Sequence, residues 1–429
     1  MSIVAIVDSG VNLLHHDLVD NLWVNSEEIA GNGIDDDGNG AIDDIHGFDT
    51  FESGGLKKSI SNHGDPQGHG THVAGIVSTL EPKARIMPIR MLDANGDGLL
   101  SDALFAWSYA LENGAKVINN SFGIAGLPSS EFSFMEEAVR LGKQKYGAIF
   151  ISAAGNQGNN NDLVPCTPAN VPGMISVGAT SLDGGAATFS NYGKTSVHLF
   201  APGENILSAD AFSLTDRSRK SGTSQAAPMV SALAAKMFIK KSKSKPSAIE
   251  KKLFKQLKSS SLLDGKSTTG GVLSAKYTKK IVSMSGSPRA RRSERDQLSG
   301  GLVNYGRFVG VLDEANGMNQ QDVMNLLNCR DVDYVEDIDW TFDNIAVFSL
   351  EQDALGLNRH DQNSRSSQRV MQQSRRSKPQ KALKVIQNLG VFKSLEWDAF
   401  VTQMSSDMLL PDGISMIPAD SVSPSLFSV

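Results

Sequence analysis

Short apolar runs alternate along residues 1–284 with longer segments whose apolar residues recur at helical spacing. The runs predict strands buried on both faces, over residues 2–7, 85–92, 115–120, 147–154, 174–179 and 198–202. Helical spacing is clear over residues 102–113 and again in the segment after Gly222. The alternation of strands and helices predicts an α/β fold, with a doubly wound, mainly parallel sheet and helices on both faces.

The remainder of the chain has a different pattern. Residues 285–302 are rich in Ser, Gly and Arg and are predicted to form a linker. Strand-like runs over residues 303–311, 332–335 and 345–350, with a helical segment over 319–327, predict a small α+β module across residues 303–353. Residues 354–429 include the polar stretch 358–381 and are predicted to be a largely disordered tail with short helices.

Composition narrows the classes of function. A chain of 429 residues is long enough for roughly two or three domains. The net charge of −6 gives no reason to expect nucleic acid as a partner, and no apolar run is long enough for a membrane span. The two cysteines, Cys166 and Cys329, provide no disulfide framework. No signal peptide is recognisable and strand-like sequence begins almost at once, so we expect a chain that lacks its natural beginning.

An acidic loop, NGIDDDGNGAIDD, occupies residues 32–44. Its carboxylates and amides alternate as in the first part of a calcium loop, with a glycine at the sharp turn, but position twelve is His46 instead of Glu. We predict a structural Ca²⁺ here, with four side-chain ligands: Asp35, Asp37, Asn39 and Asp43. A solvated acidic turn is the alternative interpretation.

Four polar residues each stand where a predicted strand ends or a predicted helix begins. Asp8 follows the first strand, Asn156 follows the strand at 147–154, and His69 and Ser224 each open a helix. Open α/β sheets place their functional sites at such ends. A serine hydroxyl is a poor nucleophile at neutral pH and needs an adjacent base. His72 falls one turn inside its helix and is predicted to be structural.

The order Asp, His, Asn, Ser comes with four local motifs: DSGVNLLHHDL, GHGTHVAGI, SAAGNQG and SGTSQAAP. Over about residues 1–284 the sequence resembles the subtilisin-like (subtilase) serine proteases. The resemblance implies a serine endopeptidase in which Ser224 is the nucleophile, His69 the general base and Asp8 the group that orients the imidazole. Asn156 would form the oxyanion hole together with the backbone N–H of Ser224.

The resemblance also implies where a substrate binds. The segments 96–98 and 121–123 would clasp an extended peptide, and Leu100 and Phe122 would line an apolar pocket. Cys166 stands at the base of the primary pocket, where many relatives have glycine. The implied substrate-binding residues are Gly96, Gly98, Leu100, Ser121, Phe122, Gly123, Ala153, Ala154, Gly155 and Cys166. Asp17 corresponds to a calcium ligand of many relatives, but the inserted loop that completes that site is missing, so no ion is expected there.

The implied partners are polypeptide substrates and an inhibitory propeptide, and the implied location is outside the cell or in the lumen of the secretory pathway. VDYVED at residues 332–337 resembles the end of a subtilase propeptide, so we predict that module 303–353 slows the protease. A partner-binding module, a small α+β module with another role and a disordered tail are the alternatives for this region. Arg289–Arg292 resembles a furin-type processing site, although a solvated basic run fits equally well. A peptide ligase or cyclase with the same residues, and a catalytically silent binding protein, are the alternative functions.

Overall fold

A nine-stranded sheet forms the centre of the computed structural model, which describes residues 1–50, 64–279, 281–282, 303–312, 320, 335–341, 345–350 and 392–403. The strand order is β13 (Leu257–Ser259), β14 (Gly271–Leu273), β10 (Leu199–Pro202), β9 (Ile175–Thr180), β7 (Ile149–Ala153), β5 (Val117–Asn120), β1 (Ser2–Asp8), β3 (Ala84–Arg90) and β2 (Phe48–Asp49). Neighbouring strands are parallel except β13 and β14.

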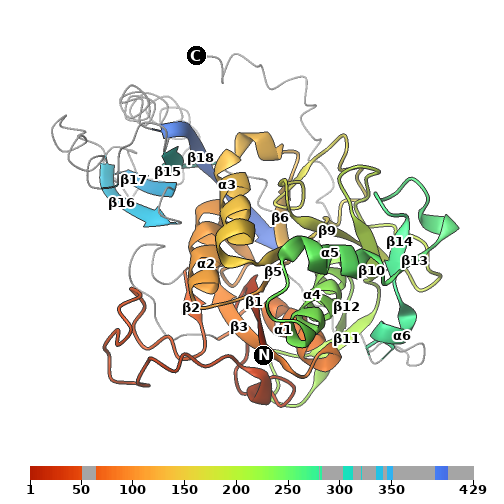
Figure 1. The fold of residues 1–429 in the computed structure, drawn as a ribbon, viewed down its shortest axis with the longest axis horizontal. Coiled ribbons are helices and arrows are strands. Elements are labelled where there is room, and N and C mark those ends of the chain that lie inside the picture. Colours follow the sequence, from red (N-terminus) through yellow and green to blue (C-terminus); the bar gives the residue numbers. More distant parts are fainter. Residues whose placement is uncertain are drawn as a thin grey trace, which may run out of the picture.

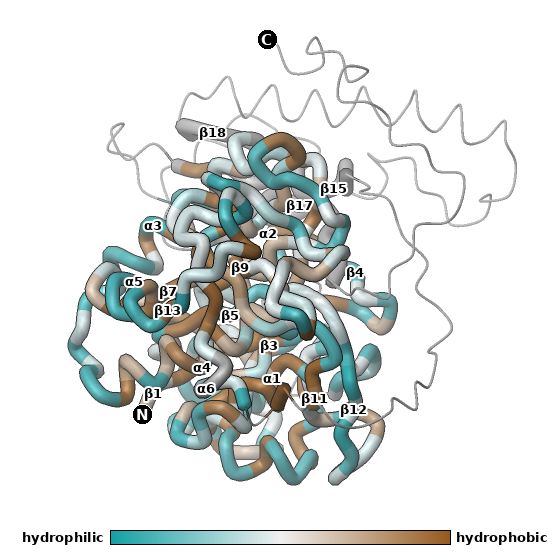
Figure 2. Tube along the Cα trace, turned by 90° about the vertical axis from the view of Figure 1, so that its right-hand side faces the viewer, coloured by the Kyte–Doolittle hydropathy of each residue, from teal (hydrophilic) through white to brown (hydrophobic). Residues whose placement is uncertain are grey.

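Helices cover both faces of this sheet because alternate residues of each buried strand point to opposite sides. Val4 and Ile6 of β1 pack in one hydrophobic cluster with α1 (His69–Leu80) and α4 (Thr223–Lys240). Ala5 and Val7 pack in a second cluster with α2 (Leu100–Glu112) and α3 (Ser133–Leu141). The α/β, doubly wound fold predicted from the sequence is therefore confirmed, and Figure 2 shows hydrophobic stretches concentrated along these central elements.

The remaining helical elements are short and lie around the sheet. They are α5 (Pro246–Phe254), α6 (Ala275–Thr278), the π-helical turn η3 (Gly142–Tyr146) and three 3-10 turns, η1 (Val19–Asn21), η2 (Ser129–Glu131) and η4 (Ser261–Leu263). Two strands, β11 (Ile206–Ala209) and β12 (Arg217–Lys220), form an antiparallel hairpin-like pair beside α1.

A second, antiparallel sheet joins the C-terminal part of the chain to the first domain. Its order is β16 (Val335–Thr341), β17 (Ile345–Leu350), β15 (Val303–Leu312), β18 (Phe392–Gln403), β6 (Phe122–Ala125) and β8 (Cys166–Thr167), and β4 (Asp97–Leu99) also pairs with β18. Figure 1 shows β18, in blue, running from β15 past α2 and α3 toward β6.

Some of the strands predicted for the C-terminal part are present in the structure, and others differ. β15 and β17 lie where strands were predicted, whereas the predicted strand 332–335 begins at its last residue and continues as β16. The predicted linker, the basic run within it and the helix 319–327 lie outside the described residues, apart from the single residue 320. The prediction of a largely disordered tail with short helices is wrong for residues 392–403, which form strand β18.

Candidate active site

Asp8 and His69 meet at the carboxyl end of the sheet. Asp8 is the last residue of β1 and His69 the first residue of α1, and both side chains are buried. His69 Nδ1 lies 2.7 Å from Asp8 Oδ1, and the backbone N–H of Ser9 donates to the same oxygen at 2.8 Å. Because Nδ1 must carry the proton that faces a carboxylate, Nε2 of the neutral ring holds the lone pair. That Nε2 is buried and has no hydrogen-bond partner among the described residues.

A glycine permits this close approach of helix to strand. A Cβ on Gly70 would lie 2.1 Å from the Gly10 carbonyl oxygen and 3.1 Å from Asp8 Cβ. Any larger residue at this position would push α1 away from β1. Gly70 therefore allows the short distance between the His69 imidazole and the Asp8 carboxylate.

Asp65 fixes the start of α1 and was missed in the sequence analysis. Its Oδ1 accepts from Gly68 N (2.7 Å) and Ser9 Oγ (2.8 Å), and its Oδ2 accepts from Thr71 N (2.7 Å) and Thr71 Oγ1 (2.6 Å). This carboxylate satisfies helix N–H groups that lack intrahelical partners and interacts favourably with the helix dipole. It also links α1 to the residue beside Asp8, so it holds both catalytic segments together.

We expect Asp65→Ala to lower the free energy of unfolding by about 3 kcal/mol, because several buried donors lose one shared acceptor. We also expect kcat to fall about a hundredfold, because a shift of about 1 Å in His69 costs that much. Thermal unfolding and peptide hydrolysis measure the two effects. Asp20→Ala, at an exposed carboxylate, is the control, and a stable Asp65→Ala enzyme with full kcat would contradict the assignment.

Ser224 is the second residue of α4 and is buried. Pro228 has no N–H, so the helix cannot supply the usual donor to the Ser224 carbonyl, and Ser121 Oγ donates to it instead at 3.2 Å. Ser224 Oγ in turn donates to the Ser121 carbonyl at 3.1 Å. Asn119 Nδ2 donates to Ser121 Oγ at 3.0 Å, and Ser231 Oγ donates to Asn119 Oδ1 at 2.8 Å. A buried polar network from β5 to α4 thus holds the serine.

Asn156 lies beside the N-terminus of α4 with its amide orientation fixed. Its Oδ1 accepts from Thr223 N at 2.8 Å and from Thr223 Oγ1 at 2.9 Å. The backbone N–H can bond only to an oxygen, so the NH₂ group must be the other end of the amide. Asn156 Nδ2 is buried and has no partner among the described residues, which leaves a donor ready for an external acceptor.

His72 has a structural environment, in line with its predicted role. It is fully buried, and its Nε2 lies 3.2 Å from each of two carbonyl oxygens, those of Ile206 and Ser218. Two acceptors require a proton on Nε2. Burial lowers the pKa of His72 well below its ordinary value, so the ring is neutral and joins α1 to the β11–β12 pair.

The predicted substrate-binding residues fall in four segments of the chain. Gly98 lies in β4 with Gly96 just before it, and Leu100, which opens α2, shares a buried hydrophobic cluster with Phe122. Ser121 precedes Phe122 and Gly123 in β6. Ala153, Ala154 and Gly155 follow one another at the end of β7, and Cys166 lies in β8, paired with Ala125 of β6.

The Cys166 side chain is fully buried. Burial raises the pKa of its thiol to about 12, so the sulfur remains a neutral thiol. A neutral, buried thiol is a weak nucleophile and behaves as a small apolar side chain. The residue can therefore limit a pocket, but it does not compete with Ser224 chemically.

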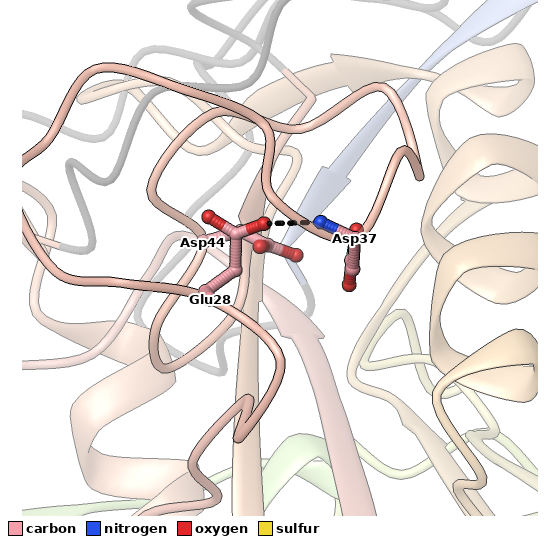
Figure 3. Close-up of side chains that lie close together, drawn as sticks. All are labelled: Glu28, Asp37 and Asp44. Atoms are coloured by element: carbon pink, nitrogen blue, oxygen red, sulfur yellow. Dashed lines mark hydrogen bonds between the residues drawn. The ribbon is translucent and has the colours of Figure 1, made fainter.

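The acidic loop brings together a different set of carboxylates from the predicted one. Glu28, Asp37 and Asp44 each offer an oxygen within 4.8 Å of the others. Figure 3 shows these three side chains close together. Asp35 and Asp43 are not part of this group, and both accept hydrogen bonds from backbone N–H groups of the loop. Glu28 and Asp44 were not predicted as ligands.

Hydrogen-bond donors offset part of the negative charge of this cluster, and the backbone N–H groups of Asp36 and Asp37 both donate to Glu28 Oε1. Glu28 and Asp44 are buried, and Glu28 Oε2 has no partner among the described residues. Burial raises the pKa of Asp44 to about 6, although Tyr109, Asn39 and Asn25 donate to its carboxylate. Asn39 also donates to Asp37, so this predicted ligand contacts the cluster through its NH₂ group.

Asp17 has a cationic partner. Arg217 Nε and Nη2 lie 2.6 Å from the two oxygens of the Asp17 carboxylate, a bidentate ion pair. The hydrogen bond from Arg217 lowers the pKa of Asp17. The charge of the Asp17 carboxylate is therefore neutralised by an arginine.

Comparisons with known proteins identify the family of the chain. The Subtilase family model matches residues 2–278. The Thermophilic serine proteinase of Bacillus sp. (strain AK1) is 34% identical over 242 residues, which cover 54% of this chain and 51% of that protein. The Extracellular serine proteinase of Thermus sp. (strain Rt41A) is 36% identical over 195 residues, 44% of either chain. The chain spans about half the length of these curated relatives.

A solved structure gives the same result for the fold. The crystal structure of a cold adapted subtilisin-like serine proteinase is 26% identical with a TM-score of 0.50, and the match covers 63% of this chain and 88% of that one. Within the described part of the chain, no helix combines the length and hydrophobicity that crossing a bilayer requires.

Proposed function

The chain belongs to the subtilase family, and on this premise we propose that it is a serine endopeptidase that hydrolyses peptide bonds in polypeptides. One observation carries the proposal: the buried His69 donates from Nδ1 to Asp8 and keeps an unpartnered Nε2 as a base. A general base needs a lone pair, a fixed tautomer and a counter-charge for the cation it becomes. The pair provides all three.

The reaction starts when Ser224 Oγ exchanges the Ser121 carbonyl for His69 Nε2 as its hydrogen-bond acceptor. His69 takes the proton as Oγ attacks the scissile carbonyl carbon, and Asp8 stabilises the imidazolium. The carbonyl oxygen becomes negative and accepts hydrogen bonds from Asn156 Nδ2 and the backbone N–H of Ser224, at the positive end of α4. His69 then protonates the leaving amine, and water releases the acyl group by the reverse sequence.

The decisive experiment is covalent labelling of Ser224 with a small alkyl fluorophosphonate, followed by peptide mapping. We expect a single modified peptide that contains Ser224, and no labelling of His69→Ala protein. Mass analysis of products from a peptide substrate, with and without an added amine nucleophile, separates hydrolysis from ligation. Binding of peptide without labelling would instead support a silent binding protein.

We also propose a structural Ca²⁺ at the acidic loop, held by Glu28, Asp37 and Asp44. A set of carboxylate oxygens suits a hard cation, and the buried, unpartnered Glu28 Oε2 needs a positive partner. The ion would offset the repulsion between three carboxylates and tie the loop to α2 through Tyr109, which donates to Asp44.

Removal of calcium with a chelator is expected to lower the melting temperature by about 5 °C, because a ligand that binds only the folded state stabilises it by mass action. Thermal unfolding with and without EDTA measures this shift. Asp37→Asn should abolish the shift. If Glu28, Asp37 and Asp44 hold the ion, Glu28→Gln should abolish the EDTA-dependent shift and Asp43→Asn should preserve it. A shift that is preserved in Glu28→Gln and abolished in Asp43→Asn would instead support the ligand set predicted from the sequence. An unchanged melting curve in EDTA would leave a solvated acidic turn.

The proposed location is outside the cell or in the lumen of the secretory pathway. The relative from Thermus sp. is named an extracellular proteinase, and 36% identity over 195 residues supports the same setting for this chain. Polypeptides in that environment are the proposed substrates.

A further inference from the structure

The C-terminal end of β18 lies between two strands of the first domain. Phe400, Val401 and Thr402 pair antiparallel with Leu99, Gly98 and Asp97 of β4. On the other side, Thr402 and Gln403 pair antiparallel with Gly123 and Phe122 of β6. Thr402 therefore has a backbone neighbour on each side, and this end of β18 is the middle strand of a three-stranded ladder.

The two neighbours of β18, β4 and β6, contain the segments 97–98 and 122–123, which the family resemblance implies would clasp an extended substrate. A peptide bound between β4 and β6 would use the same backbone N–H and C=O groups that β18 uses. β18 also ends close to the nucleophile, because its last residue, Gln403, pairs with Phe122. The residue before Phe122 is Ser121, whose carbonyl oxygen accepts a hydrogen bond from Ser224 Oγ at 3.1 Å. A peptide cannot occupy these edges while β18 holds them.

A separate docking surface holds β18 in place. β18 pairs with β15 along most of its length, and β15 pairs with β17. Val311 of β15 and Ile345 of β17 are fully buried in the hydrophobic cluster that contains Phe134 and Met135 of α3. α2 and α3 also contact β18. The antiparallel sheet thus packs on α2 and α3, and β18 extends from this sheet to β4 and β6.

We propose that β18 is a built-in, competitive inhibitor of the peptidase, which occupies the substrate strand position between β4 and β6. The inference rests on the proposed function, and it moves the inhibitory element from residues 303–353 to 392–403. The sheet of β15, β16 and β17 is the anchor. Tethering gives such a strand an effective concentration of the order of millimolar, so weak backbone pairing is sufficient to exclude dilute substrate.

The test removes backbone donors of β18 one at a time in the full chain. Consecutive residues of a middle strand direct their N–H groups to opposite neighbours, so Val401→Pro and Thr402→Pro each break a different edge of the ladder. Val401→Ala and Thr402→Ala keep the N–H and are the matched controls. We expect the proline variants to hydrolyse a succinylated tetrapeptide p-nitroanilide about tenfold faster at low substrate, with a lower apparent KM, and the alanine variants to match the parent chain.

A small alkyl fluorophosphonate separates failure of this inference from failure of the proposed function, because it needs the nucleophile but no pairing with β4 or β6. Equal labelling of Ser224 in all chains, with hydrolysis rates within about twofold, would overturn the inhibitory role and leave the peptidase. Absence of labelling and hydrolysis in every chain would overturn the peptidase and, with it, the inhibitor.

A second measurement does not depend on the folding of a variant. A peptide aldehyde that forms an adduct with Ser224 is added to the parent chain, and hydrogen exchange is followed. We expect the amides of residues 400–403 to lose protection as the aldehyde displaces the strand, while those of 345–350 keep it. Unchanged protection of 400–403 in the inhibited enzyme would show that β18 does not compete for the site.

Discussion

Ser224→Ala and His69→Ala are each expected to lower kcat about a millionfold, the size of the loss known for the equivalent changes in subtilisin. The physical reason is that nucleophile and base act as one unit: without His69 Nε2 the serine keeps its proton, and without Oγ the base has no proton to move. Hydrolysis of a peptide p-nitroanilide, compared at equal protein concentration, measures the loss. Substrate binding should change little, because neither group contacts substrate strongly in the ground state.

The double variant gives the sharper test. Combining Ser224→Ala with His69→Ala should add almost nothing to either single loss, since the unit is already broken. Ser78→Ala is the matched control, a buried serine on α1 that donates to Gly75 O at 3.1 Å and lies outside the site. Losses that multiply in the double variant would mean that the two residues act independently, and the triad assignment would be wrong.

The candidate catalytic residues could be proposed from the sequence because their signals are local. The strand before Asp8 is an unbroken apolar run, and the glycines beside His69 and Ser224 stand within a few residues of the groups they position. The structure explains why one of them, Gly70, must be a glycine, because a Cβ at this position would lie 2.1 Å from Gly10 O. Local motifs and buried-strand periodicity are therefore sufficient for the central sheet and for the Asp8–His69 pair.

Groups that act through long-range contacts could not be predicted in the same way. Asp65 stands in an ordinary turn sequence, and its function depends on Ser9, the residue directly after β1, which only the tertiary fold brings near. Glu28 precedes the acidic loop motif, so a search by spacing does not include it, although its oxygens complete the carboxylate cluster. Both needed the tertiary structure.

Strand β18 is an intermediate case. Leu395, Trp397, Ala399 and Val401 alternate with other residues, which is the pattern of a strand. The polar stretch 358–381 before it led to the prediction of a tail that covered this signal. Even with the strand recognised, its pairing with β4 and β6 links positions about 300 residues apart, which periodicity does not encode.

Asn156→Ala is expected to lower kcat about a hundredfold to a thousandfold with little change in KM, the loss known for an oxyanion donor in subtilisin. The carbonyl oxygen of the bound substrate is only partly negative, so a donor that meets the full charge of the tetrahedral intermediate acts mainly on the transition state. Asn156 suits this task because Thr223 holds its Oδ1 from two directions and turns the NH₂ group outward.

Two further variants separate the donor from the acceptor of this amide. Asn156→Asp keeps an oxygen for Thr223 N–H but replaces the donor by a negative group, so its kcat should fall at least as far as that of Asn156→Ala. Thr223→Val removes one of the two bonds that orient Oδ1 and keeps the NH₂ group, so its loss should be smaller. A change mainly in KM, or an active Asn156→Asp enzyme, would show that Asn156 binds substrate in the ground state and that the oxyanion is stabilised by other groups.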